Sequence, residues 1–405
     1  MTPHEAARTR RLLYAAAFLR ALAIGLMAVL IGLYAARLGL DAAQIGVVLS
    51  AALWGAALAA LLTLLAGPHL SQRALLITMS GLPVIGAAML LSTEAFPLLA
   101  AAAFVGMFNV HGRDRGAIPI LEQAMLPATA TDRGRTRVFA WYNVLLDVGY
   151  AVGGLLAALP TLLESSLGLG TLTAMRWALA IFCVLYAAAA VLYSRLPPRL
   201  AEASPVGLRH LSPESKPIVT KISLLFFLDA FGGGFIGSAL FAYYFAQQFG
   251  VAAATIAVLF AAGRLLSAFS HLAAAWLARH IGLVNTMVYT HIPSSVLLFT
   301  IVASDRFEVA AALFLVREAL NEMDVPTRQS YVMAVVRPEE RMAAAGITAL
   351  VRSGGWAAAP IFAGMMMKAG GLGLPLVFAG ITKIAYDLLL WREFRRVKPP
   401  EEINE

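Results

Sequence analysis

The segment NVHGRDRGAIPILEQAMLP, residues 109–127, decides how many times this chain is expected to cross a membrane. It continues a mostly apolar stretch that begins at Phe96, and it places four charges in what would be the same helix: Arg113, Asp114, Arg115 and Glu122. We expect a helix over 96–126, because removing this crossing would put the two termini on opposite sides of the membrane. The charges are then tolerable only on a face that does not touch lipid.

The composition is that of a helical membrane protein. Of 405 residues, 60% are hydrophobic and only 13% are charged, whereas soluble domains carry about 25% charged residues. The apolar residues form runs long enough to cross a bilayer as helices, and the alternating segments of a membrane β-barrel are absent. We therefore expect an all-α polytopic membrane protein.

Twelve spans are expected from the hydropathy pattern: 12–36, 44–66, 74–92, 96–126, 137–160, 173–195, 219–248, 251–277, 284–303, 308–335, 342–367 and 372–391. Lys and Arg gather in the loops on the side of the termini, which places both termini in the cytoplasm. The sequence thus predicts four parts: an N-terminal six-helix bundle (1–195), a cytoplasmic central loop (196–217), a C-terminal six-helix bundle (218–397) and a polar cytoplasmic tail (398–405).

Two weak internal matches support a duplication of the six-helix unit. EQAMLPATATDRGRTR (122–137) aligns with RQSYVMAVVRPEERMA (328–343), and LRALAIG (19–25) aligns with LDAFGGG (228–234). Duplicated halves around a midplane site are typical of secondary transporters.

With these segments the sequence resembles the major facilitator superfamily over nearly its whole length. The resemblance implies two pseudo-symmetric six-helix bundles that rock about a central cavity, with coupling to protons or to a second solute. The chain departs from the family in two places. Ser71 stands where the loop after the second helix has an acidic residue, and Tyr150 stands where the antiporter motif has proline, although GYAVGG (149–154) keeps the glycines. This partial antiporter motif favours export.

Several charges lie near the middle of the expected spans, where an unpaired charge is costly. Arg20 and Asp229 have similar depths and are mates in the internal repeat, so we predict a pair between them that bridges the two halves. The pair either responds to protons or substrate, or only locks the bundles together. The candidates for substrate or proton coupling are Arg20, Asp229, Asp147, Arg352, Arg317 and Glu318.

A second candidate group lies toward the cytoplasmic side. A pairing or gating network is favoured there over direct substrate contact, and Arg113 is the member placed nearest to substrate. The group consists of Arg113, Asp114, Arg115, Glu122, Gln123, Arg328 and Gln329.

Three successive glycines, Gly232, Gly233 and Gly234, predict a hinge in the seventh helix, with tight helix packing as the alternative. Lys383 and Asp387 stand four residues apart, which indicates a local pair.

Neither a metal nor a cofactor is expected. His271 and His291 are isolated in the sequence, and the single Cys183 excludes a cysteine zinc cluster.

We expect a secondary active transporter of a small solute that works by alternating access, with proton-coupled export by antiport favoured. The alternatives are proton-coupled uptake, exchange of an organic anion, or a receptor that does not transport. An enzyme is not expected, because no clustered nucleophile and base occur, and ATP-driven transport would need a P-loop, which is absent. We further expect a monomer in the lipid bilayer of a bacterial inner membrane. Nucleic acid is not an expected partner, since the net charge of +8 is spread over short loops.

Overall fold

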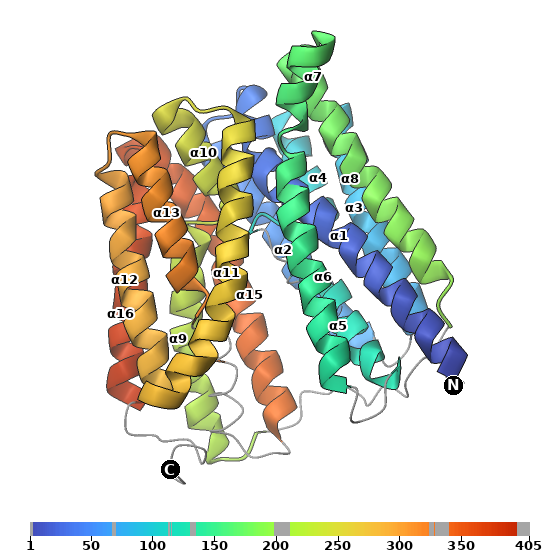
Figure 1. Ribbon diagram of the computed structural model, residues 1–405, viewed down its shortest axis with the longest axis vertical. Coiled ribbons are helices and arrows are strands. Elements are labelled where there is room, and N and C mark those ends of the chain that lie inside the picture. The colour runs from blue at the N-terminus through green and yellow to red at the C-terminus, as the bar shows by residue number, and fades with distance from the viewer. Residues whose placement is uncertain are drawn as a thin grey trace. The chain divides into compact units, whose positions relative to one another are not determined.

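The computed structural model describes residues 3–66, 70–111, 114, 116–129, 135–197, 211–323, 328 and 340–394. Every regular element within these ranges is a helix (Figure 1). The order of the helices follows the expected order of the spans, because each apolar run is long enough to satisfy its own backbone as a helix.

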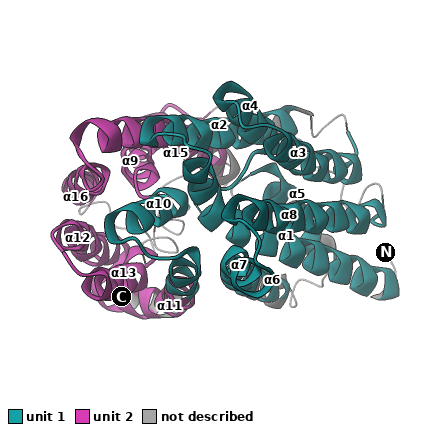
Figure 2. Ribbon diagram, turned by 90° about the horizontal axis from the view of Figure 1, so that it is seen from above, with its two compact units in different colours: residues 1–206, 237–261 teal, residues 207–236, 262–405 magenta. Residues whose placement is uncertain are grey.

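The chain forms two compact units, which Figure 2 colours separately. Unit 1 comprises residues 1–206 and 237–261, and unit 2 comprises residues 207–236 and 262–405. The predicted boundaries of bundles, central loop and tail stay predictions.

Unit 1 is built around its first helix. Residues along almost all of the apolar part of α1 are buried, including Leu13, Ile24 and Tyr34, as expected for a helix that is apolar on every face. Helix α1 packs against α6, α8 and α10. The helices of unit 1 are α1 (Pro3–Arg37), α2 (Ala42–Ala66), α3 (Gln72–Ser92), α4 (Phe96–Gly106), α5 (Ala117–Met125), the 3-10 turn η1 (Leu126–Thr129), α6 (Arg135–Leu156), α7 (Leu159–Leu167), α8 (Thr171–Ser194), α10 (Ser238–Phe249) and the start of α11 (Ala253–Ile281).

The fourth expected span is not one helix, which corrects the prediction of a helix throughout 96–126. Helix α4 ends at Gly106, Met107 adopts a left-handed conformation (φ 48°), and α5 begins only at Ala117. The side chain of Asn109 accepts a hydrogen bond of 3.0 Å from the N–H of His111, so a polar side chain replaces part of the lost helical bonding. Irregular backbone at membrane depth is tolerated where protein covers it.

Helix α10 contacts this interruption. The N–H of Ala239 donates a hydrogen bond of 3.1 Å to the carbonyl oxygen of Val110. On the neighbouring α1, a Cβ added to Gly32 would lie 2.8 Å from the carbonyl oxygen of Ala239. The glycine therefore permits the close approach of α10 to α1.

Unit 2 contains α9 (Ser215–Gly234), the remainder of α11, α12 (Leu283–Val302), α13 (Phe307–Asn321), α15 (Arg341–Gly370) and α16 (Leu374–Phe394). Helix α9 packs against α15 and α16, while α12 packs against α13 and α16. Their apolar core is formed by Val219, Ile222, Phe226, Val284, Met287, Val288, Ala344, Tyr386, Leu390 and Phe394.

The seventh expected span is also interrupted. Helices α9 and α10 form one apolar stretch, Ser215–Phe249, but α9 ends at Gly234 and α10 begins at Ser238. The prediction of a continuous helix over 219–248 is therefore wrong at residues 235–237, where the chain leaves unit 2 and enters unit 1. The tenth expected span, 308–335, is helical up to Asn321, and most of its remainder lies outside the described residues.

Among the described residues, seven helical stretches are long and apolar enough to cross a membrane: His4–Arg37, Ala42–Thr63, Gln72–Ser92, Trp141–Leu167, Thr171–Ser194, Ser215–Phe249 and Leu374–Phe394. Other expected crossings are shorter, interrupted or more highly charged, as α4 and α13 illustrate.

Candidate functional site

Each unit contains a cluster of buried charges. In unit 1 the centre is Arg20 of α1, whose side chain is completely buried. Its guanidinium forms ion pairs with Asp114, in the interruption between α4 and α5, and with Glu122 of α5. An arginine at this depth is stable only when carboxylates of this kind compensate its charge.

Glu122 is held by neutral donors as well. The hydroxyl of Tyr142 on α6 donates to one carboxylate oxygen at 2.7 Å, and the hydroxyl of Tyr193 on α8 donates to the other at 2.5 Å. An ionised carboxylate only accepts hydrogen bonds, so these donors match its capacity. The carboxylate of Glu122 thus joins four helices of unit 1.

Asp114 shapes the interruption in which it lies. Its carboxylate accepts a hydrogen bond of 2.9 Å from the N–H of Gly116, while its own N–H donates to the hydroxyl oxygen of Tyr150 at 3.0 Å. The same carboxylate pairs with Arg20. The interruption of the fourth span therefore brings a charged side chain to α1 that a continuous helix would position differently.

Arg20 and Asp229 each have partners within their own unit, and the predicted pair between them stays a prediction. Arg20 takes its carboxylate partners from unit 1, and Asp229 takes its cations from unit 2. The candidate network is only partly assembled around Arg20, since Asp114 and Glu122 belong to it but Gln123 is exposed. Arg113, Arg115 and Gln329 lie outside the described residues.

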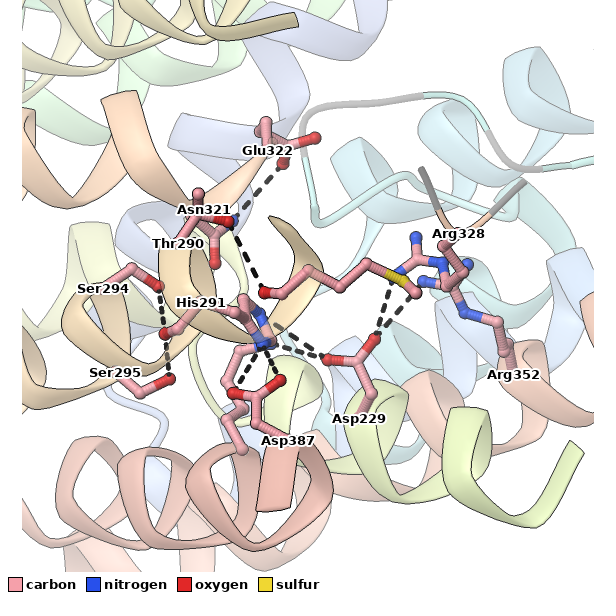
Figure 3. A network of polar contacts seen from close by, with 12 residues as sticks. Asp229, Thr290, His291, Ser294, Ser295, Asn321, Glu322, Arg328, Arg352 and Asp387 are labelled. Carbon is pink, nitrogen blue, oxygen red and sulfur yellow. Dashed lines mark hydrogen bonds and ion pairs between the residues drawn. The ribbon is translucent and has the colours of Figure 1, made fainter. Parts of the chain in front are cut away.

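The cluster of unit 2 is centred on Asp229 of α9, which is 4% exposed (Figure 3). Lys383 of α16 donates to its Oδ1 at 2.8 Å. Arg328 and Arg352 approach its Oδ2 at 3.3 and 3.6 Å. One buried carboxylate thus attracts three cationic side chains from different parts of unit 2.

A histidine lies next to this carboxylate. His291 of α12 is 2% exposed, and its Nδ1 lies 2.9 and 3.0 Å from the two carboxylate oxygens of Asp387 on α16. Its other nitrogen, Nε2, lies 3.9 Å from Oδ1 of Asp229. Figure 3 shows the ring between the two carboxylates.

Aromatic rings border the arginines. The guanidinium of Arg352 lies 4.5 Å from the ring centroid of Trp356 and 5.7 Å from that of Phe226, and the guanidinium of Arg328 lies 5.5 Å from the ring of Phe226. Such cation–π contacts favour keeping the guanidinium groups where they face Asp229.

Sequence reasoning missed how Lys383, Asp387 and His291 combine. The spacing of Lys383 and Asp387 indicated a local pair, yet Lys383 contacts Asp229 on α9 and Asp387 contacts His291 on α12. His291 has no charged neighbour in the sequence, because its partners Asp387 and Asp229 are far away along the chain. Three polar residues within apolar helices were the available signal, but their pairing depends on which helices are neighbours.

Arg317 and Glu318 form a separate group on α13. Their side chains pair at 2.5 Å, and Arg317 also donates to the side-chain oxygen of Asn321 at 3.2 Å. The hydroxyl of Ser267 on α11 donates to the main-chain oxygen of Glu318 at 3.3 Å. Of the remaining coupling candidates, Asp147 lies on α6 and is partly buried.

The three glycines of α9 lie where that helix meets its neighbours. A Cβ added to Gly234 would lie 2.5 Å from the Cβ of Ala359 on α15, and one added to Gly233 would lie 3.3 Å from Nε1 of Trp356. Gly232 lies against Lys383. These contacts indicate tight packing, and the end of α9 at Gly234 leaves the hinge as a proposal.

The glycines that resembled an antiporter motif lie against α1. A Cβ added to Gly149 would be 2.6 Å from the Cβ of Ala21, and one added to Gly153 would collide with the main-chain oxygen of Leu22. Close packing of α6 on α1 therefore accounts for both glycines without reference to the direction of transport.

Within the ranges that the structure describes, no three His, Cys, Asp or Glu side chains are grouped so that they could hold a metal ion. The chemistry available in both clusters is that of ion pairing, hydrogen bonding and proton binding.

Comparisons with known proteins agree with this arrangement. The sequence model of the Major Facilitator Superfamily matches residues 13–316 and, in a second match, residues 222–405. An uncharacterized membrane protein of Saccharomyces cerevisiae, YJR124C, is 23% identical over 95% of this chain and 94% of its own length.

Solved structures show the same fold. The nucleoside transporter NupG superposes with a TM-score of 0.75 and 16% identity over 96% of this chain and 99% of its own. A D-xylose-proton symporter superposes with a TM-score of 0.71 and 13% identity over 95% of this chain and 98% of its own.

These matches confirm the predicted fold class, an all-α polytopic membrane protein of the twelve-helix transporter type. The chain belongs to the Major Facilitator Superfamily and is a secondary transporter, not an enzyme.

Proposed function

We propose that this protein is a proton-coupled transporter of a small solute, working by alternating access. One observation carries the proposal: Asp229, 4% exposed within a membrane helix, holds Lys383, Arg328 and Arg352 in unit 2. A proton delivered to such a cluster changes the charges that hold α9 to its neighbours. Buried ionisable groups in membrane helices commonly mark proton and substrate pathways.

Export by antiport is the direction that we propose, with both termini in the cytoplasm of a cell whose inner membrane contains the protein as a monomer. The support for export is the glycine-rich segment 149–154. Packing against α1 also explains Gly149 and Gly153. A flux measurement is therefore needed to determine the direction of transport.

The role of the unit 1 cluster in this proposal is to hold its helices together. Glu122 combines Arg20 with two tyrosine hydroxyls, and all these groups are buried. A buried carboxylate that accepts from three donors resists rearrangement, which suits a structural contact between helices better than a substrate contact. Arg317, Glu318 and Asp147 stay candidates for coupling.

A second candidate function is uptake or exchange of an organic anion. It is favoured by the convergence of Arg328, Arg352 and Lys383 on a single carboxylate, since guanidinium groups bind carboxylates and phosphates well. In this alternative, the carboxylate of the solute would compete with Asp229 for the arginines.

The test is a flux assay in proteoliposomes with an imposed pH gradient of either sign. A defined mixture of isotope-labelled uridine, D-xylose and succinate serves as the probe; the first two follow from what the similar structures transport, and the third represents an organic anion. Export by antiport predicts that solute accumulates in the compartment that is more acidic at the start. Accumulation in the opposite compartment would show symport. Transport of a solute at a rate and to a level that the pH gradient does not change would overturn proton coupling.

A further inference from the structure

We infer that unit 2 contains a specific proton-binding site at Nε2 of His291. Asp387 orients the ring, and the carboxylate of Asp229 faces the positive charge that the ring gains. The inference rests on the proposed function, because it names the group that takes up the coupled proton. The residues come from α12, α16 and α9, and each ring nitrogen has a defined protonation state.

The position of Asp387 determines the tautomer of the neutral ring. Both oxygens of this carboxylate lie within 3.0 Å of Nδ1. An ionised carboxylate only accepts hydrogen bonds, so with Asp387 ionised the hydrogen is on Nδ1. The lone pair of the neutral imidazole is then on Nε2.

Nε2 faces a second carboxylate. It lies 3.9 Å from Oδ1 of Asp229, so in the neutral ring a lone pair and a carboxylate oxygen face each other. A proton that binds to the lone pair converts Nε2 into a donor and gives the ring one positive charge. The new N–H bond replaces an O–H bond of the hydronium ion that delivers the proton, and the added charge faces Asp229 directly.

Groups from every packed element surround the ring. The carboxylates are Asp229 on α9 and Asp387 on α16, the latter completely buried. The cations, Lys383, Arg328 and Arg352, all contact Asp229. Tyr386 of α16 presents its ring nearly perpendicular to the imidazole at a centroid distance of 6.1 Å. Glu322 and Asn321 lie at another end of the network in Figure 3. A carboxylate on each side thus favours the imidazolium, while the cations beyond Asp229 oppose it.

Protonation has a structural consequence through Asp229. Its contacts with Arg328 and Arg352, at 3.3 and 3.6 Å, are longer than the roughly 2.7–2.9 Å of a strong charged hydrogen bond. An imidazolium at His291 competes for the same carboxylate and weakens these longer contacts. Because Arg352 belongs to α15, the proton loosens the attachment of α9 to α15 just before the end of α9 at Gly234.

The direct test is a pH titration of histidine ring nitrogens by NMR, using the full chain labelled with 15N-histidine in nanodiscs. Comparing wild type with His291→Gln assigns the signals of His291, and His280→Gln, which alters an exposed histidine of α11, is the matched control. We expect hydrogen on Nδ1 alone at the alkaline end of the titration and on both nitrogens at the acidic end. A ring that stays neutral, or stays doubly protonated, throughout the titration would overturn the inference.

Asp387→Leu provides the second test, because leucine has a similar branched shape but neither of the two acceptor oxygens. It should abolish the preference for hydrogen on Nδ1, seen as mixed tautomers at high pH. An unchanged Nδ1–H tautomer would contradict the orienting role of Asp387. The titration requires no substrate and tests only the proton site at His291. Failure of proton-coupled flux in wild type would overturn the proposed function without changing the outcome of the titration.

Discussion

The guanidinium of Arg20 and the carboxylate of Glu122 pair with each other, and both side chains are completely enclosed within unit 1. The pair connects α1 with α5, the helix that begins after the interruption of the fourth span. Glu122, one of the charges that interrupt the apolar fourth span, is thus a partner of the buried Arg20.

This pair predicts a large loss of stability when one partner is neutralised. Glu122→Gln leaves Arg20 with Asp114 only, and we expect a cost of about 3 kcal/mol in the free energy of unfolding, as for other broken buried pairs. Tyr193→Phe removes one hydrogen bond to a charged group and should cost about 1.5–3 kcal/mol. Unfolding in detergent, followed by circular dichroism, measures both.

The neighbouring Gln123 supplies the control, because its side chain is exposed. Gln123→Ala should leave the unfolding midpoint unchanged. If Glu122→Gln unfolds at the same denaturant concentration as Gln123→Ala, the pair does not stabilise unit 1.

A second prediction compares two adjacent glycines of α6. A Cβ at Gly153 collides with the main chain of Leu22, whereas one at Gly154 meets no described atom within 4 Å. Gly153→Ala should therefore cost about 1–3 kcal/mol through overpacking, while Gly154→Ala should be neutral or slightly stabilising. Thermal unfolding of the two variants decides, and equal midpoints would refute close packing of α6 on α1.

A third prediction compares two lysines with equal ion-pair distances. Lys383 lies 2.8 Å from Asp229 with both side chains buried, and Lys221 lies 2.8 Å from Glu393 with both exposed. Lys383→Met should destabilise by on the order of 3 kcal/mol, because it removes a partner of a buried carboxylate. Lys221→Met should leave the midpoint almost unchanged, because water screens exposed pairs. A larger effect at Lys221 would contradict this assignment.

The sequence predicted the order and approximate bounds of the membrane helices, because hydropathy and backbone satisfaction act locally. The end of α4 at Gly106 escaped this reasoning, although Asn109, Asp114 and Gly116 are residues that favour turns. A count of crossings required one span there, and the structure has two shorter helices, α4 and α5, instead.

The sequence predicted which charged residues are buried better than it predicted which residues they contact. Arg20 and Asp229 were singled out correctly as buried charges, since polar residues inside apolar helices are conspicuous. Which groups they contact depends on helix packing, and this explains why the pairing of Arg20 with Glu122 was not predicted. The same limit concealed His291, whose role follows only from the proximity of α12, α16 and α9.

The most direct test of proton coupling compares Asp229→Asn with Asp305→Asn, a neutralisation of an exposed carboxylate. Both variants are reconstituted in proteoliposomes, and accumulation driven by a pH gradient is measured beside exchange at equal pH, with the uridine, D-xylose and succinate mixture. We predict that Asp305→Asn behaves as wild type, and that Asp229→Asn keeps exchange but loses about tenfold or more of the gradient-driven accumulation, equivalent to ~1.4 kcal/mol of coupling. Gradient-driven accumulation by Asp229→Asn at the wild-type level would contradict the account.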